Sequence, residues 1–160
     1  MPTILDAIRE LLTSGAAHFV EKHHDPTFTS EQSAQARGEP LRHGGKALLI
    51  KTDDVFRLFV VPADRKLDSA AIKRELGVKR TRFATPEELE ELTGLVPGSV
   101  PPFGQPILPF ELFVDAAIRD NPRIAFNAGS LTDSIILPVP EYLAIAKPRV
   151  FEFSQPADVP

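Results

Sequence analysis

One segment organises the predicted fold: His43-Gly44-Gly45-Lys46-Ala47-Leu48-Leu49-Ile50-Lys51. Its four apolar residues form a short run bounded by turn-forming and charged residues, which is typical of a strand buried on both faces. Lys46 would then lie where this strand meets the surface, with its ammonium group beside a cleft. A solvated lysine at the end of a strand is the simpler interpretation. The segment lacks the longer glycine-lysine spacing of a phosphate-binding P-loop.

Composition narrows the class of protein. A chain of 160 residues suits one domain, 1–160, that buries its own core. No cysteine is present, so disulfides and thiolate chemistry are excluded. The net charge of −4 disfavours binding along a nucleic acid but permits a protein that holds only its end. The apolar residues near the N-terminus are too few and too interrupted by charges for a membrane span or signal peptide. We therefore expect a cytoplasmic protein without a membrane partner.

The rest of the chain alternates irregularly between helical and extended patterns. Helices are expected at 4–13, from Thr29 to about Gly38, at 69–76 after an Asp68 cap, from Thr85-Pro86, and at 140–146. Strands are expected at 17–22, 46–52, 55–61, 110–114, 123–126, 134–137 and 149–153, the second and third joined by an Asp53-Asp54 turn. Residues 93–109 are too rich in proline and glycine for a regular element, and the tail 154–160 is expected to be flexible. This order favours an α/β fold of the mixed, α+β type over a doubly wound parallel sheet.

Side chains that could carry chemistry are sparse. Three glycine-bearing segments fall at strand edges or in the long loop, where a backbone can approach a ligand: Gly44-Gly45-Lys46, Gly98–Gly104 and Asn127–Ser130. His43 is the one histidine that we retain as a site candidate. No group has metal-ligand spacing, so neither metal nor cofactor is expected. A basic strip is the part of the surface best suited to a phosphate backbone: Arg65, Lys66, Lys73, Arg74, Lys79, Arg80 and Arg82.

An ordered set of motifs resembles the YbaK/prolyl-tRNA synthetase-associated domain family of aminoacyl-tRNA deacylases. The matching segments span about 110 residues and are Thr29-Ser30-Glu31, Lys46–Leu49, Val61–Asp68, Thr93-Gly94, Gly98–Gly104, Val114-Asp115 and Phe126–Ser130. The resemblance implies a curved mixed central β-sheet with flanking helices. It also implies hydrolysis of the ester of mischarged tRNA, most often tRNA for proline carrying alanine or cysteine. Lacking any synthetase portion, the chain resembles the free-standing, trans-editing members.

The resemblance also assigns roles to residues. It makes Lys46, preceded by Gly45, the essential lysine that engages the 3′-terminal nucleotide. Backbone groups that bracket the aminoacyl end, and the wall of the amino-acid pocket, fall on Gly98, Ser99, Val100, Pro101, Pro102, Asn127, Gly129, Ser130 and Ser30. Some members carry a histidine soon after the second glycine loop. None follows Ser130 here, so the choice of amino acid cannot be transferred.

An already activated ester needs an aligned water and donors to its developing oxyanion, which backbone N–H groups can supply. The implied partners are mischarged tRNA, through its aminoacyl end, and a prolyl-tRNA synthetase; monomer and homodimer both fit the sequence. Two other classes compete with this interpretation. A binding module would hold the tRNA end or a nucleotide in the same pocket without turnover. An interaction protein would use its N-terminal helix or last strand, and Lys46 would affect only stability.

Overall fold

A mixed five-stranded sheet forms the centre of the molecule. The computed structural model describes residues 3–157. The sheet has the order β5 (Thr81–Phe83), β2 (Gly45–Thr52), β3 (Val55–Pro62), β6 (Leu112–Asp115) and β9 (Arg149–Phe151). Strands β5, β2 and β3 pair antiparallel, whereas β3, β6 and β9 pair parallel. The expected mixed sheet is therefore confirmed.

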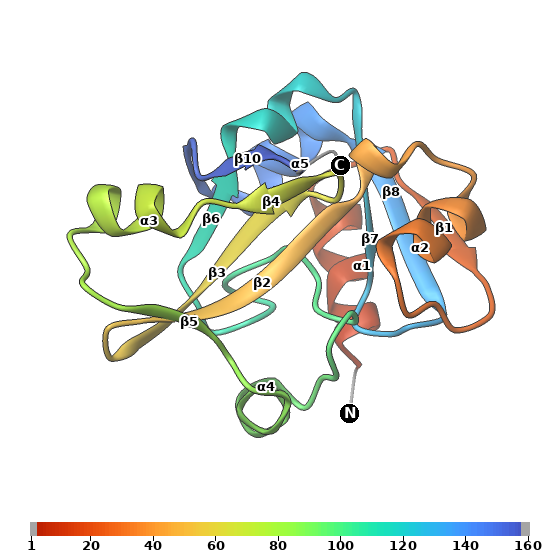
Figure 1. Cartoon of the computed structure of the whole chain (residues 1–160). Helices are drawn as coiled ribbons and strands as arrows, with labels where there is room; N and C mark the ends of the chain where they lie inside the picture. Colours follow the sequence, from red (N-terminus) through yellow and green to blue (C-terminus); the bar gives the residue numbers. More distant parts are fainter. Residues whose placement is uncertain (1–2, 158–160) are drawn as a thin grey trace.

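Two smaller sheets complete the framework. One has the order β1 (Val20–His23), β8 (Asp133–Pro138) and β7 (Arg123–Asn127), with antiparallel pairing throughout. It meets the central sheet where Gly44 forms a parallel bridge with Ala125. The other sheet pairs β10 (Ser154–Pro156) with β4 (Arg65–Leu67). Figure 1 shows β7 and β8 standing beside β2, with β1 and α2 beyond them.

Within residues 3–157, five α-helices surround these sheets: α1 (Ile4–Ser14), α2 (Ser30–Arg37), α3 (Ser69–Leu76), α4 (Pro86–Thr93) and α5 (Val139–Ala146). Each expected helix is confirmed to within a few residues. The caps follow from the sequence: Thr85 and Glu88 form a reciprocal capping box, and the Asp68 side chain accepts from the N–H of Ala71. No helix among residues 3–157 is long and apolar enough to cross a membrane.

The apolar residues divide into two clusters on opposite sides of the central sheet. The larger cluster joins the sheets to α1 through the fully buried Ile8 and Leu12. The smaller one lies under α3, where Phe59 stacks on Phe113 with ring centroids 5.0 Å apart. Successive side chains of β2 point to opposite faces of the sheet and so contribute to both clusters: Leu49 packs in the larger cluster and Ile50 in the smaller.

Two expectations from the sequence are wrong. Strand β2 is not buried along its length: Lys46 is exposed, and Ala47 and Leu48 are only half-buried. The reason is that β5 pairs only with Ile50–Thr52, so the first half of β2 remains an edge. The tail was expected to be flexible from residue 154, yet Ser154–Pro156 forms β10. Residues 158–160 of that tail lie outside the described residues.

Side-chain hydrogen bonds from distant parts of the chain explain why the tail forms β10. The buried Asp115 carboxylate accepts hydrogen bonds from the Phe153 N–H at 2.7 Å and from the Ser154 hydroxyl at 2.6 Å. Arg65 donates from Nε to the same hydroxyl at 2.7 Å. Thr93 ends α4, and the rest of the long loop, 94–109, has no helix or strand, as expected. The loop is nevertheless packed: Phe103 is buried, and the Tyr142 hydroxyl donates to the Pro102 carbonyl at 2.6 Å.

Candidate active site

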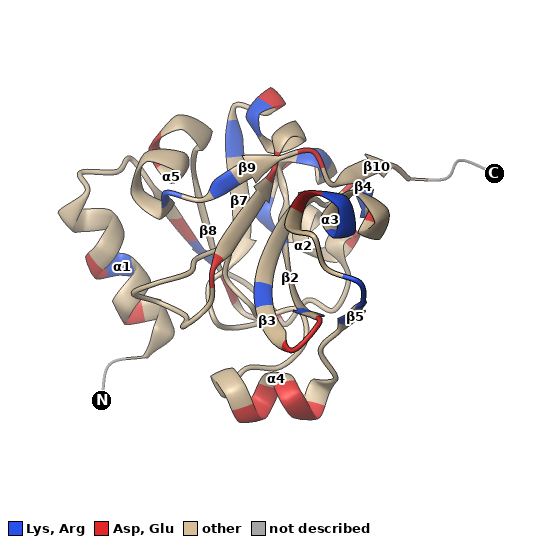
Figure 2. Cartoon of the chain, turned by 90° about the vertical axis from the view of Figure 1, so that its left-hand side faces the viewer, with Lys and Arg blue, Asp and Glu red and all other residues tan. Residues whose placement is uncertain are grey.

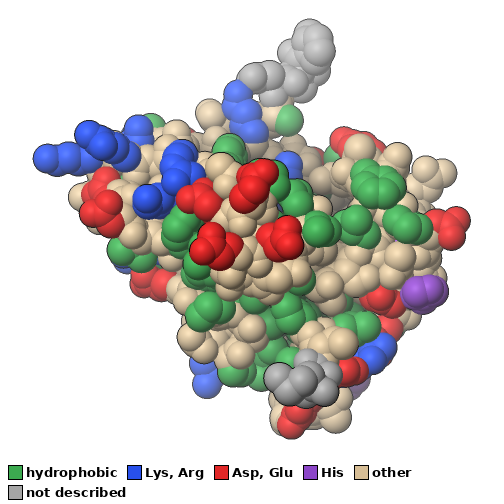
Figure 3. Space-filling view, turned by 90° about the horizontal axis from the view of Figure 1, so that it is seen from below, with side chains coloured by type: hydrophobic (Ala, Val, Ile, Leu, Met, Phe, Trp, Pro, Cys, Tyr) green, Lys and Arg blue, Asp and Glu red, His purple; other side chains and the backbone are tan. Residues whose placement is uncertain are grey.

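A cavity of about 580 Å³ opens between the exposed edge of β2, helix α2, the β5–α4 connection and the long loop. This size is in the range of small-ligand sites. Its lining residues are Thr27–Glu31, Ser33, Arg37, Gly44–Leu49, Ala63, Phe83, Ala84, Pro86, Leu89, Pro97, Gly98, Val100 and Asn127. Seen from below, a group of acidic side chains lies at the position of α4, with basic side chains to its left (Figure 3).

The edge of β2 leaves backbone groups open to this cavity. The Ala84 N–H donates to the Leu49 carbonyl, and β5 continues the pairing from Ile50 onward. At the other end, Gly44 bridges to β7. Between these points β2 has no second partner strand among the described residues. The alternation of an antiparallel ladder directs the N–H and C=O of Ala47 to the open side.

Six of the predicted site residues lie in the cavity lining: Lys46, Gly45, Ser30, Gly98, Val100 and Asn127. They come from four parts of the chain, β2, α2, the long loop and β7, which the fold brings together. The N–H groups of Gly98 and Val100 form no hydrogen bond with any described residue. Both residues line the cavity, so these two N–H groups are unpaired backbone donors in its wall.

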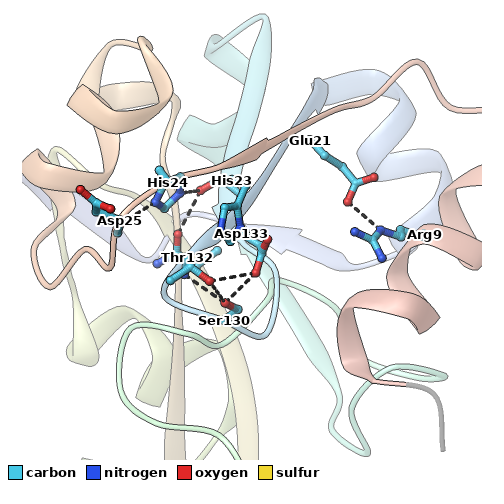
Figure 4. A network of polar contacts seen from close by, with 10 residues as sticks. Arg9, Glu21, His23, His24, Asp25, Ser130, Thr132 and Asp133 are labelled. Carbon is cyan, nitrogen blue, oxygen red and sulfur yellow. Dashed lines mark hydrogen bonds and ion pairs between the residues drawn. The ribbon is translucent and has the colours of Figure 1, made fainter.

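The other predicted site residues have positions behind the wall. Ser99, Pro101 and Pro102 are buried in the loop, and Ser99 accepts a hydrogen bond at its carbonyl from the Gly129 N–H at 3.0 Å. This bond occupies the N–H of Gly129. Ser130 belongs to the turn between β7 and β8, where its hydroxyl donates to the Asp133 carboxylate at 2.9 Å (Figure 4). These residues do not line the cavity.

Asn127 connects the loop to the small sheet. Its Nδ2 donates to the Gly98 carbonyl at 2.8 Å, and its Oδ1 accepts from Arg37 Nη2 at 3.0 Å and from the Ser134 hydroxyl at 3.1 Å. Arg37 Nε also donates to Ser134 at 2.9 Å. Every hydrogen-bonding atom of the Asn127 amide group thus has a fixed partner. As a result, the long loop is held against β7 at Gly98.

Arg37 was missed by the sequence analysis, although it lines the cavity and is only 6% exposed. Burial lowers the pKa of its guanidinium to about 10, against the opposing pull of the Glu39 carboxylate. It therefore stays charged near neutral pH. The one available signal was its helical spacing: Ser33, Ala34 and Arg37 share the face on which α2 is buried.

A pair of hydroxyls forms another polar part of the cavity wall. The Thr27 and Ser33 hydroxyl oxygens lie 2.7 Å apart, and both residues are buried. One hydroxyl must donate to the other. The hydrogen of the second hydroxyl has no recorded acceptor among the described residues, so it can donate to a ligand.

The histidines lie away from the cavity lining. His43, the retained candidate, is buried behind β2, where Nδ1 lies 3.0 Å from Glu39 Oε1 and Nε2 has no hydrogen-bond partner among the described residues. His23 pairs with Asp133 at the surface, as Figure 4 shows, and holds the pKa of that carboxyl below its usual value. Within residues 3–157 no three His, Asp or Glu side chains gather in a metal-binding arrangement.

Sequence comparison places this cavity within a known family of domains. The sequence model of the aminoacyl-tRNA editing domain matches residues 24–145. The multifunctional Ser/Thr-tRNA deacylase ProXp-y of Escherichia coli K12 is 35% identical over 153 residues, covering 92% of this chain and 90% of its own. The proline–tRNA ligase of Shouchella clausii is 33% identical over 123 residues, which are 76% of this chain and 21% of the ligase.

Solved structures show the same likeness. A crystal structure described as a trans-editing enzyme for prolyl-tRNA synthetase has a TM-score of 0.80 and 26% sequence identity. The superposition covers 97% of this chain and 99% of that one. The family match spans most of the chain and contains all the cavity-lining residues. The chain therefore belongs to the aminoacyl-tRNA editing domain family and is an aminoacyl-tRNA deacylase.

Proposed function

We propose that the substrate is a mischarged tRNA that carries a small hydroxylated amino acid, serine or threonine. The observation that carries this proposal is the buried Thr27–Ser33 pair, which has one hydroxyl hydrogen left for a ligand. A site built to donate to a substrate hydroxyl disfavours an analogue that lacks it, because the buried donor is then unsatisfied. The E. coli relative is named as a deacylase for the same two amino acids. Alanine, the family's frequent substrate, lacks the matching acceptor.

The ester would lie between the edge of β2 and the long loop. Water adds to the ester carbonyl carbon, and the oxygen that becomes negative accepts hydrogen bonds from the N–H groups of Gly98 and Val100. The bond to the ribose oxygen then breaks, and that oxygen takes a proton, which releases free amino acid and tRNA. The neighbouring ribose hydroxyl of the substrate can assist this transfer. Gly129 has no part in this proposal, since its N–H already donates to Ser99.

Lys46 positions the substrate rather than attacking it. It is exposed on the cavity edge of β2, and an ammonium group binds phosphate as a point charge. We propose that it binds the terminal nucleotide of the tRNA.

The tRNA for proline is the proposed carrier of the amino acid, because of the likeness to proline–tRNA ligase and to the trans-editing structure. A prolyl-tRNA synthetase is the corresponding proposed partner, and the cytoplasm, where aminoacyl-tRNA is made and used, the proposed compartment. One chain lines the whole cavity, so a monomer would suffice.

The test of the amino-acid choice is a double substitution, Thr27→Val with Ser33→Ala. Exchanging both partners for apolar groups of similar shape has little effect on stability. It is expected to reduce the kcat/KM for seryl-tRNA relative to alanyl-tRNA by about tenfold. Ser33→Ala alone is the matched control, because Thr27 then keeps a hydroxyl hydrogen for the substrate. An unchanged ratio in the double variant would overturn the assignment.

A further inference from the structure

Arg37 is a buried cation whose charge has no ionic partner in the described part of the chain. Helix α2 ends at this residue because Gly38 takes the left-handed conformation, with φ of 70°, and turns the chain away. The side chain is thereby directed inward, and it lines the cavity. Its two recorded acceptors, Ser134 and Asn127, are both neutral. The nearby Glu39 carboxylate is already engaged by His43 and Arg123.

A buried guanidinium without an ionic partner can bind an anion that enters the cavity. It has five N–H donors, and its Nη1 has no recorded acceptor among the described residues. An unpaired buried charge is costly, and an anion in the cavity would offset that cost. The two neutral hydrogen bonds fix the plane of the fork, which suits recognition of an oxyanion by two parallel bonds.

Arg37 lies over the same face of β2 as Lys46. A Cβ built on Gly44 would lie 3.7 Å from Arg37 Nη1. Gly44 is extended, and Lys46 follows two residues later, so both positions face the same side of the chain. The guanidinium therefore lies beside Gly44, two residues before the lysine in the chain and on the same face. The two cations flank one corner of the cavity, although they come from separate elements.

The charge on the substrate decides which group occupies this corner. The aminoacyl group carries an ammonium, which two cations repel. Glu31, six residues before Arg37 and about 9 Å away along the helix, also lines the cavity and would attract it. We propose that Arg37 and Lys46 together bind the phosphate attached to the 5′ oxygen of the terminal nucleotide. This inference rests on the proposed function, since it concerns the same substrate.

The experiment compares two small substrates that differ only in this phosphate: 3′-O-seryl-adenosine 5′-monophosphate and 3′-O-seryl-adenosine. Arg37→Gln is expected to lower kcat/KM for the monophosphate by about 10- to 100-fold, which is the effect of losing a charge-assisted hydrogen bond. The same variant should lower kcat/KM for the adenosine ester much less, so the readout is the ratio of the two kcat/KM values within each variant. Because the comparison is made within each variant, partial loss of folded protein cancels.

Two controls make the comparison specific. Arg149 is an exposed arginine on β9, the edge strand farthest from β5, and it pairs with Glu75 of α3. Arg149→Gln should leave the hydrolysis of both substrates unaffected. With full-length seryl-tRNA, Arg37→Gln should reduce the slope of log(kcat/KM) against log salt by about 0.7, the value for one phosphate contact on a single strand. Arg37→Lys should restore part of the phosphate preference.

The possible results separate this inference from the proposed function. If the wild type hydrolyses both esters and Arg37→Gln impairs both equally, Arg37 acts on the ester or only on the fold, and the phosphate assignment is overturned. If the wild type shows no preference for the monophosphate, the assignment is equally overturned. If the wild type releases no serine from either ester or from seryl-tRNA, the proposed function itself fails.

Discussion

Asn127→Ala is expected to lower the free energy of unfolding by about 3 to 5 kcal/mol, because the substitution removes three hydrogen bonds at once. The bonds to the Gly98 carbonyl and the Ser134 hydroxyl are neutral, and each contributes about 1 kcal/mol. The bond from Arg37 involves a charge and contributes about 1.5 to 3 kcal/mol. Alanine leaves all three partners without the amide, while a small domain has only about 5 to 15 kcal/mol in total.

Asn121 provides a matched control. It has the same 8% exposure as Asn127, but its side chain makes one recorded bond, from Nδ2 to the Arg42 carbonyl at 2.8 Å. Asn121→Ala should therefore cost only about 1 kcal/mol. The assay is urea unfolding followed by circular dichroism, with both variants analysed at a common m-value. Equal losses for the two variants would refute the idea that Asn127 holds the loop. Deacylation should also fall in Asn127→Ala, because Gly98 loses its anchor.

Three further predictions follow from single features. Gly45→Ala should cost about 1 to 3 kcal/mol, since the new Cβ would lie 2.6 Å from Ile124 Cδ1, and adding Ile124→Val should recover part of it in urea unfolding; additive losses would contradict this contact. The hydrogen bonds from Arg82, then the Thr85 N–H, lower the pKa of Glu88 from 4.5 to about 2. The stabilising effect of its charge is therefore present above pH 4.5 and lost as pH falls toward 2, so the difference in Tm between wild type and Glu88→Gln should shrink over that range; a difference independent of pH would exclude it. Finally, the kcat/KM on full-length tRNA, but not on 3′-O-seryl-adenosine 5′-monophosphate, should fall when four exposed cations near α3 and β5 are changed to glutamine: Lys73, Arg74, Lys79 and Arg80. Equal effects on both substrates would exclude a contact with the body of the tRNA.

The charge distribution explains why that last set is informative. Figure 2 shows basic residues on α3 and next to β5, and acidic residues along α4, the helix that follows β5 in the chain. β5 lines the cavity through Phe83, and α4 lines it through Pro86 and Leu89. A tRNA that enters the cavity must therefore keep its phosphates on the α3 side and away from α4.

Local signals made much of the fold predictable. Caps gave the ends of α3 and α4 because Asp68, Thr85 and the glycines after each helix satisfy backbone groups within a few residues. The long strands β2 and β3 were recognisable from their apolar runs. In α2, the Thr29 side chain caps the helix by accepting from the Gln32 N–H, so the helix begins where the sequence predicts, and the Gln32 side chain accepts from the N–H of Phe28.

What the sequence could not show depends on distant pairing. β4 and β5 have three residues each, too short for a periodic pattern, and β10 exists because Asp115 and Arg65 hold Ser154 from remote parts of the chain. The site residues likewise fall into those that local motifs predict and those that depend on the tertiary structure. Lys46 and Gly98 lie in recognisable motifs, whereas Arg37 sits in a short polar helix whose inward face only the tertiary structure reveals.

The most direct measurement is the release of free amino acid from a panel of mischarged tRNAs for proline, carrying serine, threonine or alanine, by the wild type and Lys46→Ala. The wild type should hydrolyse the seryl and threonyl esters faster than the alanyl ester, and Lys46→Ala should lose this activity while it unfolds at the same temperature, because Lys46 is exposed. Full activity in Lys46→Ala, or no release by the wild type from any member, would contradict editing at this cavity.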